Sequence, residues 1–479
     1  MVLIRSVIFL SVSLPVIYSQ YIQFSEDNDR KRCKNENDDL RLLVHKQNKI
    51  FESEVQILKK EVEGLRRESQ ELRDLMNKTL YQRKSASCTE EGLTFIGFTL
   101  TMASQVLAHK GSVLKSGEII TNYNADFNDL GEFLCCLNGT YVFFLHLVTK
   151  STNANGAWIY KNDRPMTLVW QGGPTGTPGD ASGTTSLVID LEVGDTLSIR
   201  SYKDNLSVRS TSVWSGHLLS KLPNENPVLV ATLKNPVAGN DVTIPGKEIL
   251  VNLGHANYSL TKDDFLCTKV GLYKVDINSI MNSSNNNGVE LYYNGKSLHS
   301  GLYRPVAWHS QADYSSSSTT AVLNLSPADR LSLKIKQQSE RTLSTLSVFA
   351  VYFLKNRPGD TDFSCKKLVT IGTFLACPKS FNIFNLTGFL NIKTKGFYYF
   401  SIHLTSGTSE NGVQIFTNNK RLTTAWLGAD WGTWQTASTS VVVKLDIGDY
   451  VTFRKITSGL KVDHASIIAG YKIDTEKST

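Results

Sequence analysis

Two patterns of hydrophobic and polar positions divide the chain, which has 479 residues. Over residues 39–80, apolar residues recur every three or four positions, as on one face of a helix. From residue 89 onward, short segments rich in Val, Ile, Thr, Tyr and Phe alternate apolar with polar side chains. Gly-Asp, Asn-Gly and Asn-Asn pairs lie in the turns between them, because Gly and Asn tolerate a positive φ. The pattern predicts a helical segment followed by an all-β region.

One strand pattern occurs three times in the β region. An aromatic residue or leucine is followed after five residues by Gly-x-Tyr-x-apolar, with the glycines at Gly139, Gly271 and Gly396. Each copy continues with an Asn in a turn, a Trp, a Ser/Thr-rich run, a Gly-Asp or Ala-Asp turn and a final apolar strand. Many short strands without interleaved helices predict β-sandwich or jelly-roll domains. We place three of them at residues 89–222, 226–356 and 364–475.

These motifs resemble the globular head domain of the complement C1q family, which is related in fold to tumour necrosis factor. The match lies in F-x5-G-x-Y-x-F, the later L-x-x-G-D turn and the terminal S-G-x-L-L strand of the first repeat. The second repeat departs at Val275 and Ala328, and the third at Leu390. The resemblance implies three tandem ten-stranded jelly rolls that associate in threes through an apolar face. The chain has no run of Gly-X-Y triplets, so the collagen stalk with which the complement protein recruits proteases is missing.

The segment before the β region has the heptad pattern of a parallel coiled coil. Taking Val44 as position d places Phe51, Leu58, Leu65 and Leu72 at d as well. Acidic residues then fall at g, with basic residues five positions later at e: Glu54 with Lys59, Glu61 with Arg66, and Glu68 with Arg73. We therefore predict a coiled coil over residues 39–80.

The number of chains in the assembly has two interpretations. Valine at a with leucine at d, and Asn48 at a, favour two strands, whereas domains of the C1q family usually trimerise. The linkers between repeats are seven residues or fewer and span at most about 25 Å, which suits side-by-side packing. We expect the three repeats to form one pseudo-trimer within the chain and the helix to pair two such heads; a trimer of chains would instead give three stacked tiers.

Residues 1–19 are typical of a secretory signal peptide, with a charged start at Arg5, an apolar stretch to Ile17 and a small residue, Ser19, before the expected cleavage site. No later stretch is apolar enough for a membrane span, so we expect a secreted, extracellular protein. The chain has seven cysteines. In an exported chain an odd number predicts an interchain disulfide, which we assign to Cys33 before the coiled coil.

Export also predicts N-linked glycans on five Asn-x-Ser/Thr sequons: Asn77, Asn205, Asn257, Asn282 and Asn385. The formal net charge is +7, but it is uneven, because residues 364–475 hold twelve Lys and Arg against six Asp and Glu. We expect this region to meet an anionic partner such as an acidic glycan or lipopolysaccharide. The cations form no basic run, so nothing supports nucleic-acid binding.

No catalytic constellation or cofactor fingerprint occurs in the sequence, and we do not expect an enzyme or a required cofactor. The aspartates of the three sharp turns, Asp195, Asp329 and Asp449, are candidate calcium ligands, since carboxylates at loop tips suit this cation. The candidate ligand contacts are Trp431 and Trp434 with Asp430, because indole faces stack on sugar rings and a carboxylate accepts hydroxyl hydrogen bonds.

The sequence thus favours a secreted, oligomeric recognition protein. It would bind carbohydrate or microbial surfaces in a lectin-like manner, in innate immunity, and by avidity. Two alternatives remain open: a structural component of an extracellular matrix, mineralised or adhesive, and a receptor-binding ligand of the tumour necrosis factor kind.

Overall fold

The computed structural model describes the helix and most of the β region. The described ranges are residues 42–68, 93–128, 130–150, 155–171, 180–221, 226–239, 243–244, 247–254, 256–259, 263–283, 287–297, 306–309, 312–336, 342–356, 363–365, 369–371, 374–376, 388–408, 411–427, 435–463 and 466–473. The chain divides into two units, Met1–Lys84 and Ser85–Thr479. The signal peptide and Cys33 lie outside the described residues.

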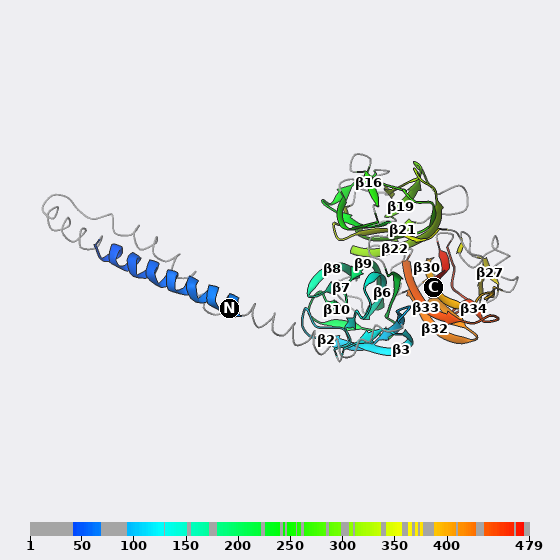
Figure 1. Ribbon diagram of the computed structural model, residues 1–479, viewed down its shortest axis with the longest axis horizontal. Helices are drawn as coiled ribbons and strands as arrows, with labels where there is room; N and C mark the ends of the chain where they lie inside the picture. Colours follow the sequence, from blue (N-terminus) through cyan, green and yellow to red (C-terminus); the bar gives the residue numbers. More distant parts are fainter. Residues whose placement is uncertain are drawn as a thin grey trace. The chain divides into compact units, whose positions relative to one another are not determined.

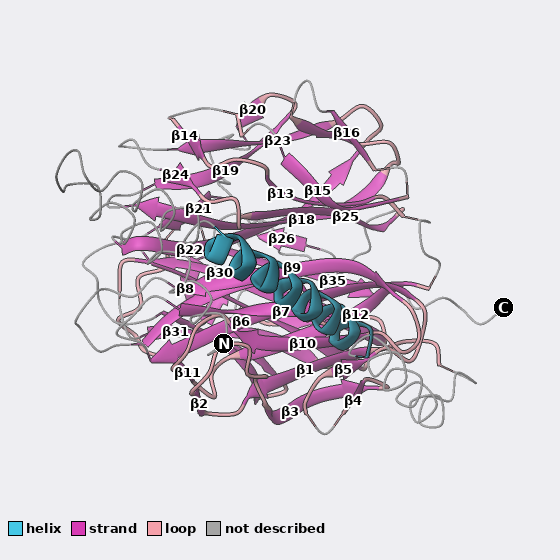
Figure 2. Ribbon diagram, turned by 90° about the vertical axis from the view of Figure 1, so that its left-hand side faces the viewer, coloured by secondary structure: helices cyan, strands magenta, loops and turns pink. Residues whose placement is uncertain are grey.

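The first unit contains a helix over residues 42–68, coloured cyan in Figure 2. Its predicted d residues Val44, Phe51, Leu58 and Leu65 are all exposed, as is Val62. The helix predicted here is confirmed over these residues, and the coiled coil stays a prediction. Among the described residues, no helix has the length and hydropathy of a membrane span.

Sandwich 1 consists of the strands between residues 97 and 220 and has two antiparallel sheets. The first has the order β2 (Gln105–Leu107), β11 (Leu206–Val208), β6 (Gly139–Lys150), β12 (Val213–Ser220), β1 (Gly97–Met102) and β3 (Ser116–Tyr123), with β9 (Asp180–Leu191) also paired to β6. The second has the order β4 (Asp126–Phe127), β5 (Phe133–Leu134), β10 (Thr196–Ser201), β7 (Asn155–Lys161) and β8 (Arg164–Gln171).

Sandwich 2, residues 228–355, repeats this arrangement. Its first sheet has the order β14 (Val237–Ala238), β24 (Thr342–Leu343), β18 (Gly271–Ser283), β25 (Val348–Lys355), β13 (Val228–Leu233) and β15 (Lys247–Leu253), with β22 (Ala312–Leu325) paired to β18. The second has the order β16 (Asn257–Ser259), β17 (Asp264–Leu266), β23 (Arg330–Lys336), β19 (Asn287–Tyr293) and β20 (Lys296–Ser297), with β21 (Val306–His309) paired to β19.

Sandwich 3, residues 363–473, has the same central strands. Its first sheet has the order β26 (Phe363–Cys365), β35 (Ile467–Ile473), β30 (Gly396–Ser406) and β33 (Gln435–Leu445). The second has the order β27 (Val369–Ile371), β28 (Phe374–Ala376), β34 (Tyr450–Lys455), β31 (Asn411–Thr417) and β32 (Lys420–Leu427), with β29 (Leu390–Asn391) paired to β34. The all-β jelly-roll class predicted for this region is confirmed.

The recurring Gly-x-Tyr strands are β6, β18 and β30, at the centre of each first sheet. The tyrosine hydroxyl donates to the backbone carbonyl four residues earlier in every copy, at 2.5–2.7 Å. A Cβ on Gly139 or Gly271 would collide with the backbone carbonyl of Ser220 or Lys355. The glycine of the motif therefore permits the close approach of two strands, and the tyrosine is held by its hydrogen bond. Both are packing requirements.

The three sandwiches contact one another in a closed, head-to-tail ring (Figure 1). Strand β9 of sandwich 1 packs against β25 and β13 of sandwich 2, and β22 of sandwich 2 packs against β35 and β26 of sandwich 3. Strand β33 of sandwich 3 completes the ring on β12 and β1 of sandwich 1. Equivalent strands form every seam, so each sandwich offers the same edge to the next, as in a cyclic trimer.

Candidate functional site

The three aspartates predicted as calcium ligands occupy the same turn in the three sandwiches. One carboxylate oxygen of each accepts a hydrogen bond from the backbone N–H three residues earlier, at 2.7–2.8 Å. The other oxygen accepts from an Asn side chain in the turn of the neighbouring hairpin, at 2.5–2.8 Å. The pairs are Asp195 with Asn162, Asp329 with Asn294, and Asp449 with Asn418.

These bonds give the recurring Asn and Asp a structural role that sequence reasoning did not assign. Burial raises the pKa of the Asp195 and Asp329 carboxyls, but the hydrogen bonds to their ionised oxygens outweigh it, so each pKa lies below its ordinary value. The aspartates lie on separate sandwiches. Over the described ranges, no three His, Cys, Asp or Glu side chains gather in a group that could hold a metal ion. Calcium binding stays a prediction.

The other predicted site residues are only partly described. Trp431, Trp434 and Asp430 lie outside the described residues, as do the sequon residues Asn77 and Asn385. Asn205 and Asn257 are exposed, a position that glycosylation requires. Asn282 lies on β18, where its backbone pairs with Thr342.

The Ser/Thr-rich run of each repeat lies on the strand that meets its neighbours at the centre of the ring. Thr184, Ser318 and Ser438 are equivalent residues on β9, β22 and β33. Ser318 Oγ bonds to the Thr184 hydroxyl on one side and to Ser438 Oγ, at 2.7 Å, on the other. All three are buried. These hydroxyl groups therefore join the sandwiches at the axis. Apolar side chains also meet across a seam, as the resemblance implied: Val142 and Val188 of sandwich 1 share a buried cluster with Val230 of sandwich 2.

Behind each of these hydroxyls lies a buried polar residue of the central strand. His146 pairs with Thr184, Asn278 with Ser318, and His403 with Ser438. His403 Nδ1 lies 2.9 Å from Ser438 Oγ, whereas neither ring nitrogen of His146 has a hydrogen-bond partner in the described parts of the chain. Burial lowers the pKa of both histidines to about 3, which suits neutral, structural imidazoles rather than acid–base catalysts.

A buried ion pair lies beside the axis in sandwich 2. Lys274 Nζ is 2.8 Å from Asp276 Oδ2 and 3.2 Å from the Tyr399 hydroxyl of sandwich 3. Asp276 also accepts from Tyr352, at 3.0 Å, and from Thr320, at 2.8 Å. Burial lowers the pKa of Lys274, but the charge of Asp276, the contact with Tyr399 and the hydrogen bonds to both together outweigh it, and the net pKa lies above its ordinary value. An alignment of the repeats makes this pair recognisable in the sequence, because the equivalent residues of sandwich 1 are the apolar Val142 and Phe144.

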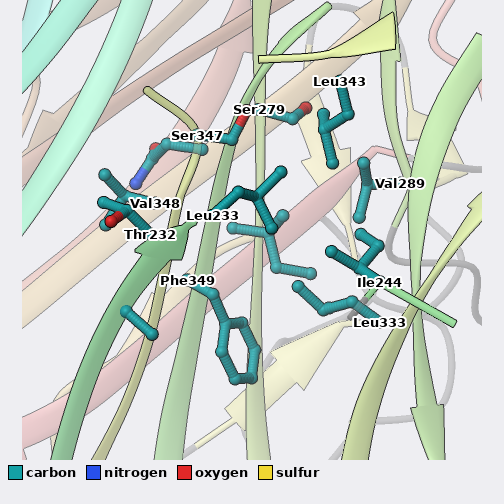
Figure 3. Close-up of a pocket in the computed structure, with 13 residues that line it drawn as sticks. Thr232, Leu233, Ile244, Ser279, Val289, Leu333, Leu343, Ser347, Val348 and Phe349 are labelled. Carbon is teal, nitrogen blue, oxygen red and sulfur yellow. The ribbon is translucent and has the colours of Figure 1, made fainter. Parts of the chain in front are cut away.

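Among the described residues at the axis, the cavity found is too small for a ligand. The cavity between Lys274, His403 and Ser438 has a volume of about 10 Å³, which is the room that one water molecule needs. A second small cavity lies inside sandwich 2 and measures about 20 Å³ (Figure 3). Leu233, Val289 and Phe349 are among the side chains that line it. Both cavities are gaps in the packing.

A larger cleft opens at the seam between sandwiches 3 and 1, with a volume of about 650 Å³. Ligand sites in proteins commonly measure about 300–1,000 Å³ and prefer interfaces between domains. Residues from β1 and β3 form one side, and residues from β31 and β32 form the other. Of the cavities above, this cleft alone has the size of a binding site.

The C1q domain matches two regions of the chain. The family model covers residues 97–219, which lie in sandwich 1, and residues 379–472, which lie in sandwich 3. The two regions together make up less than half of the chain. C1q domains generally occur in non-enzymatic, ligand-binding proteins, where they typically self-associate and act outside cells. No curated protein matches the chain.

Solved structures with similarity to the chain include two of these kinds. The globular domain of zebrafish complement 1qA protein is 15% identical, with 26% of this chain and 98% of that chain covered and a TM-score of 0.23. Eiger TNF from S. frugiperda is 14% identical, with 27% and 92% covered and a TM-score of 0.22. The triple jelly roll protein of an archaeal virus is 10% identical, with 78% and 89% covered and a TM-score of 0.19. At these identities and TM-scores the likenesses carry no argument about the function of this chain.

Proposed function

We propose that this chain is a secreted, oligomeric recognition protein that binds carbohydrate or microbial-surface ligands in a lectin-like manner. The observation that carries the proposal is the closed ring, in which two sandwiches matched by the C1q domain and a third with equivalent sheets form one head. A head of this kind presents three unequal faces on one frame. Weak contacts on several faces add up when a ligand is repeated on a surface.

Sandwich 2, as part of the same proposal, is a third domain of the C1q type. The match leaves residues 220–378 out, but the strand order of both sheets follows sandwich 1. The tyrosine lock, the Asn–Asp bridge and the axis hydroxyl all recur there, as Tyr273, Asn294 with Asp329, and Ser318. The shared features support a common origin of the three sandwiches. The charged pair Lys274–Asp276 accounts for part of the divergence of the sandwich 2 sequence from that of sandwich 1.

The helix then pairs two heads. Each seam edge of the head already contacts another sandwich of the same chain. The head therefore does not require three chains, and the number of helices in the coiled coil is set by the helix itself. The exposed apolar stripe of residues 44, 51, 58 and 65 needs cover, and Glu54 and Lys59 stand at the g and e positions of a parallel pair. Light scattering should give the mass of two chains; a mass of three would favour stacked tiers.

The test of the recognition function is a binding screen with the full-length secreted protein. Immobilised glycans and whole microbial cells serve as ligands, with calcium and with a chelator. Saturable binding that falls sharply when the helix is prevented from pairing, for example by Leu58→Glu, supports recognition by avidity. Absence of binding to every surface would contradict the proposal.

The same screen examines the predicted contacts. Replacing Trp431 and Trp434 by Ala should weaken glycan binding if their indoles stack on sugar rings. Unchanged binding by a folded variant would remove them from the site. A requirement for calcium that disappears in Asp449→Asn would place the cation at that turn.

A further inference from the structure

The cleft between sandwiches 3 and 1 has an apolar floor. Ile120, a bulged residue on β3, packs against the hydrophobic core of sandwich 3. Leu422 of β32 and Met102 of β1 also line the cleft, and both are buried. Side chains from both sandwiches therefore bound the cleft, and Ile120 supplies the partly exposed apolar side chain of its floor.

The wall from sandwich 3 owes its chemistry to a β-bulge. Gln414 pairs with Thr424, and Phe416 pairs with Arg421, with a register shift between Ile415 and Phe416. Residues in register share a face of the sheet, and alternate residues of one strand do so as well. The extra residue in β32 thus brings Arg421 to the face of Thr424. The wall presents an amide, a hydroxyl, an aromatic ring and a guanidinium, and the neighbouring Lys420 also lines the cleft.

The wall from sandwich 1 is rich in hydroxyl groups. Thr99 Oγ1 accepts a hydrogen bond from the backbone N–H of Val442 on β33, at 2.9 Å. The face of β1 that carries Thr99 is therefore turned toward sandwich 3. Thr101, two residues along the same strand, lines the cleft just beyond this contact, together with Ser210 and Thr211. Glu118 supplies a carboxylate, and its side chain is exposed.

We propose that this cleft binds an acidic sugar, that is, a sugar ring bearing a carboxylate or a sulfate group, as part of a glycan. Ile120, which is partly exposed, fits the less polar face of a sugar ring. The hydroxyls of Ser210 and Thr211 and the amide of Gln414 fit its hydroxyls. Arg421 and Lys420 pair with the anionic group, since a guanidinium binds carboxylate and sulfate oxygens in a bidentate manner. This inference rests on the carbohydrate recognition proposed above and specifies its site.

Charge makes the two walls unequal. Arg421 and Lys420 attract an anion, whereas Glu118 on the other wall repels it. A long polyanion such as a nucleic acid would need more cations than this cleft provides. A single anionic sugar satisfies both conditions, because its charge can lie on the sandwich 3 side while its ring crosses the floor.

The test compares matched pairs of sugars immobilised on an inert polymer. Glucuronic acid is set against glucose, and galactose 6-sulfate against galactose, with the full-length protein in solution. The acidic member of at least one pair should bind tenfold or more tightly than its neutral partner. The pair that shows the difference identifies the anion as a carboxylate or a sulfate.

Substitutions on the two walls should act with opposite sign. Arg421→Ala is expected to lower affinity for the acidic sugar by tenfold or more, and Glu118→Gln to raise it about threefold. Lys393→Ala removes one exposed cation from the same sandwich outside the cleft, and affinity should not change. Far-ultraviolet circular dichroism and the unfolding midpoint verify that each variant is folded.

The outcomes separate this inference from the function on which it rests. If the wild-type protein binds glycans but Arg421→Ala binds them equally well, the cleft is not the site and the recognition function stands. If Arg421→Ala and Lys393→Ala lower affinity equally, the cleft is also excluded as the site, because non-specific electrostatic attraction would then explain both losses. If the wild-type protein binds no sugar of any kind, the recognition function and this site fall together.

Discussion

Sandwiches 1 and 2 differ most at the positions where they should be most alike. In sandwich 1 the central strand turns Val142 and Phe144 toward its neighbours, and in sandwich 2 the equivalent residues are the buried ion pair Lys274 and Asp276. Sandwich 3 has Tyr399 and Ser401 there. In a trimer of identical chains, three copies of each such residue would converge, and three lysines would repel one another. A ring closed within one chain removes this constraint, so each seam holds its own chemistry.

The largest effect should follow from breaking the ion pair. Asp276→Asn leaves the ammonium of Lys274 buried without its counter-charge, which costs about 3–5 kcal/mol of stability. Urea unfolding of the full-length protein measures the loss. The double variant Lys274→Met with Asp276→Leu removes both charges at similar volume, and should be more stable than the single variant. A single variant within about 1 kcal/mol of wild type would show that the pair is not desolvated as described.

The next effect is a pH dependence of stability that comes from the buried histidines. His146 and His403 hold equivalent positions in sandwiches 1 and 3, and Asn278 holds that position in sandwich 2. Burial lowers the pKa of His146 to about 3, while the unfolded chain retains the ordinary value of about 6.5. Below that value the unfolded state binds the proton and the folded state does not, so stability falls as the pH drops toward 3. Between pH 7 and pH 5 the loss is about 2 kcal/mol for each such histidine.

The variant His146→Asn copies sandwich 2 and should remove about 2 kcal/mol of that pH dependence. Urea unfolding at pH 7 and pH 5 gives the difference directly. His109 is exposed, so the matched variant His109→Asn serves as the comparison for removing an imidazole that is not buried. An equal pH dependence in His146→Asn and wild type would mean that the buried imidazole is not neutral.

A smaller effect concerns the sharp turn before the bridging aspartate. Gly194 and Gly448 have φ of 96° and 93°, and Ala328 of sandwich 2 has a φ of 75° at the same position. A left-handed conformation costs a residue with a Cβ about 1–2 kcal/mol. Ala328→Gly should therefore stabilise the protein by about 1 kcal/mol, and Gly448→Ala, which meets no atom within 4 Å, should destabilise it similarly. Changes of the same sign in both variants would contradict this reasoning.

The smallest effect should come from the cavity of sandwich 2. Filling about 20 Å³ with the extra methylene of Val289→Ile is worth about 0.5 kcal/mol. Val413 holds the equivalent position in sandwich 3 and is completely buried. Val413→Ile should overpack that core and lower the thermal unfolding midpoint. If both variants raise the midpoint, the two cores do not differ in packing.

The fold could be predicted because the repeated landmarks are packing requirements. Tyr141 and its equivalents recur because each hydroxyl locks its own strand, and the Ser/Thr-rich runs recur because they meet at the axis. The turns of the three aspartates could be predicted, and their calcium binding stays a prediction. Their bridging of two hairpins could not be predicted, because a bridging carboxylate has the same sequence pattern as a loop-tip ligand. The Asn partner thirty or more residues away distinguishes the two only in three dimensions.

The cleft could not be predicted from periodicity. Arg421 reaches it because of one extra residue in β32, and its opposite wall comes from a segment about three hundred residues earlier in the chain. The charge excess of residues 364–475 indicated sandwich 3 as the one to meet an anion, and the cleft proposed above draws both its cations from that sandwich. The ion pair at the axis carries a signal that an alignment of the three copies would reveal, since Lys274 and Asp276 replace apolar residues of sandwich 1 in a fully buried strand.

The closed ring also determines how the head behaves on dilution. Seven residues separate the end of β12 at Ser220 from the start of β13 at Val228, and the same number separates β25 from β26. Short tethers keep each sandwich at an effective concentration near the millimolar range for its neighbours. A head made of three separate chains would dissociate in a sufficiently dilute fluid, whereas this one stays whole at any concentration. Only the pairing of heads through the helix then depends on how much protein is present.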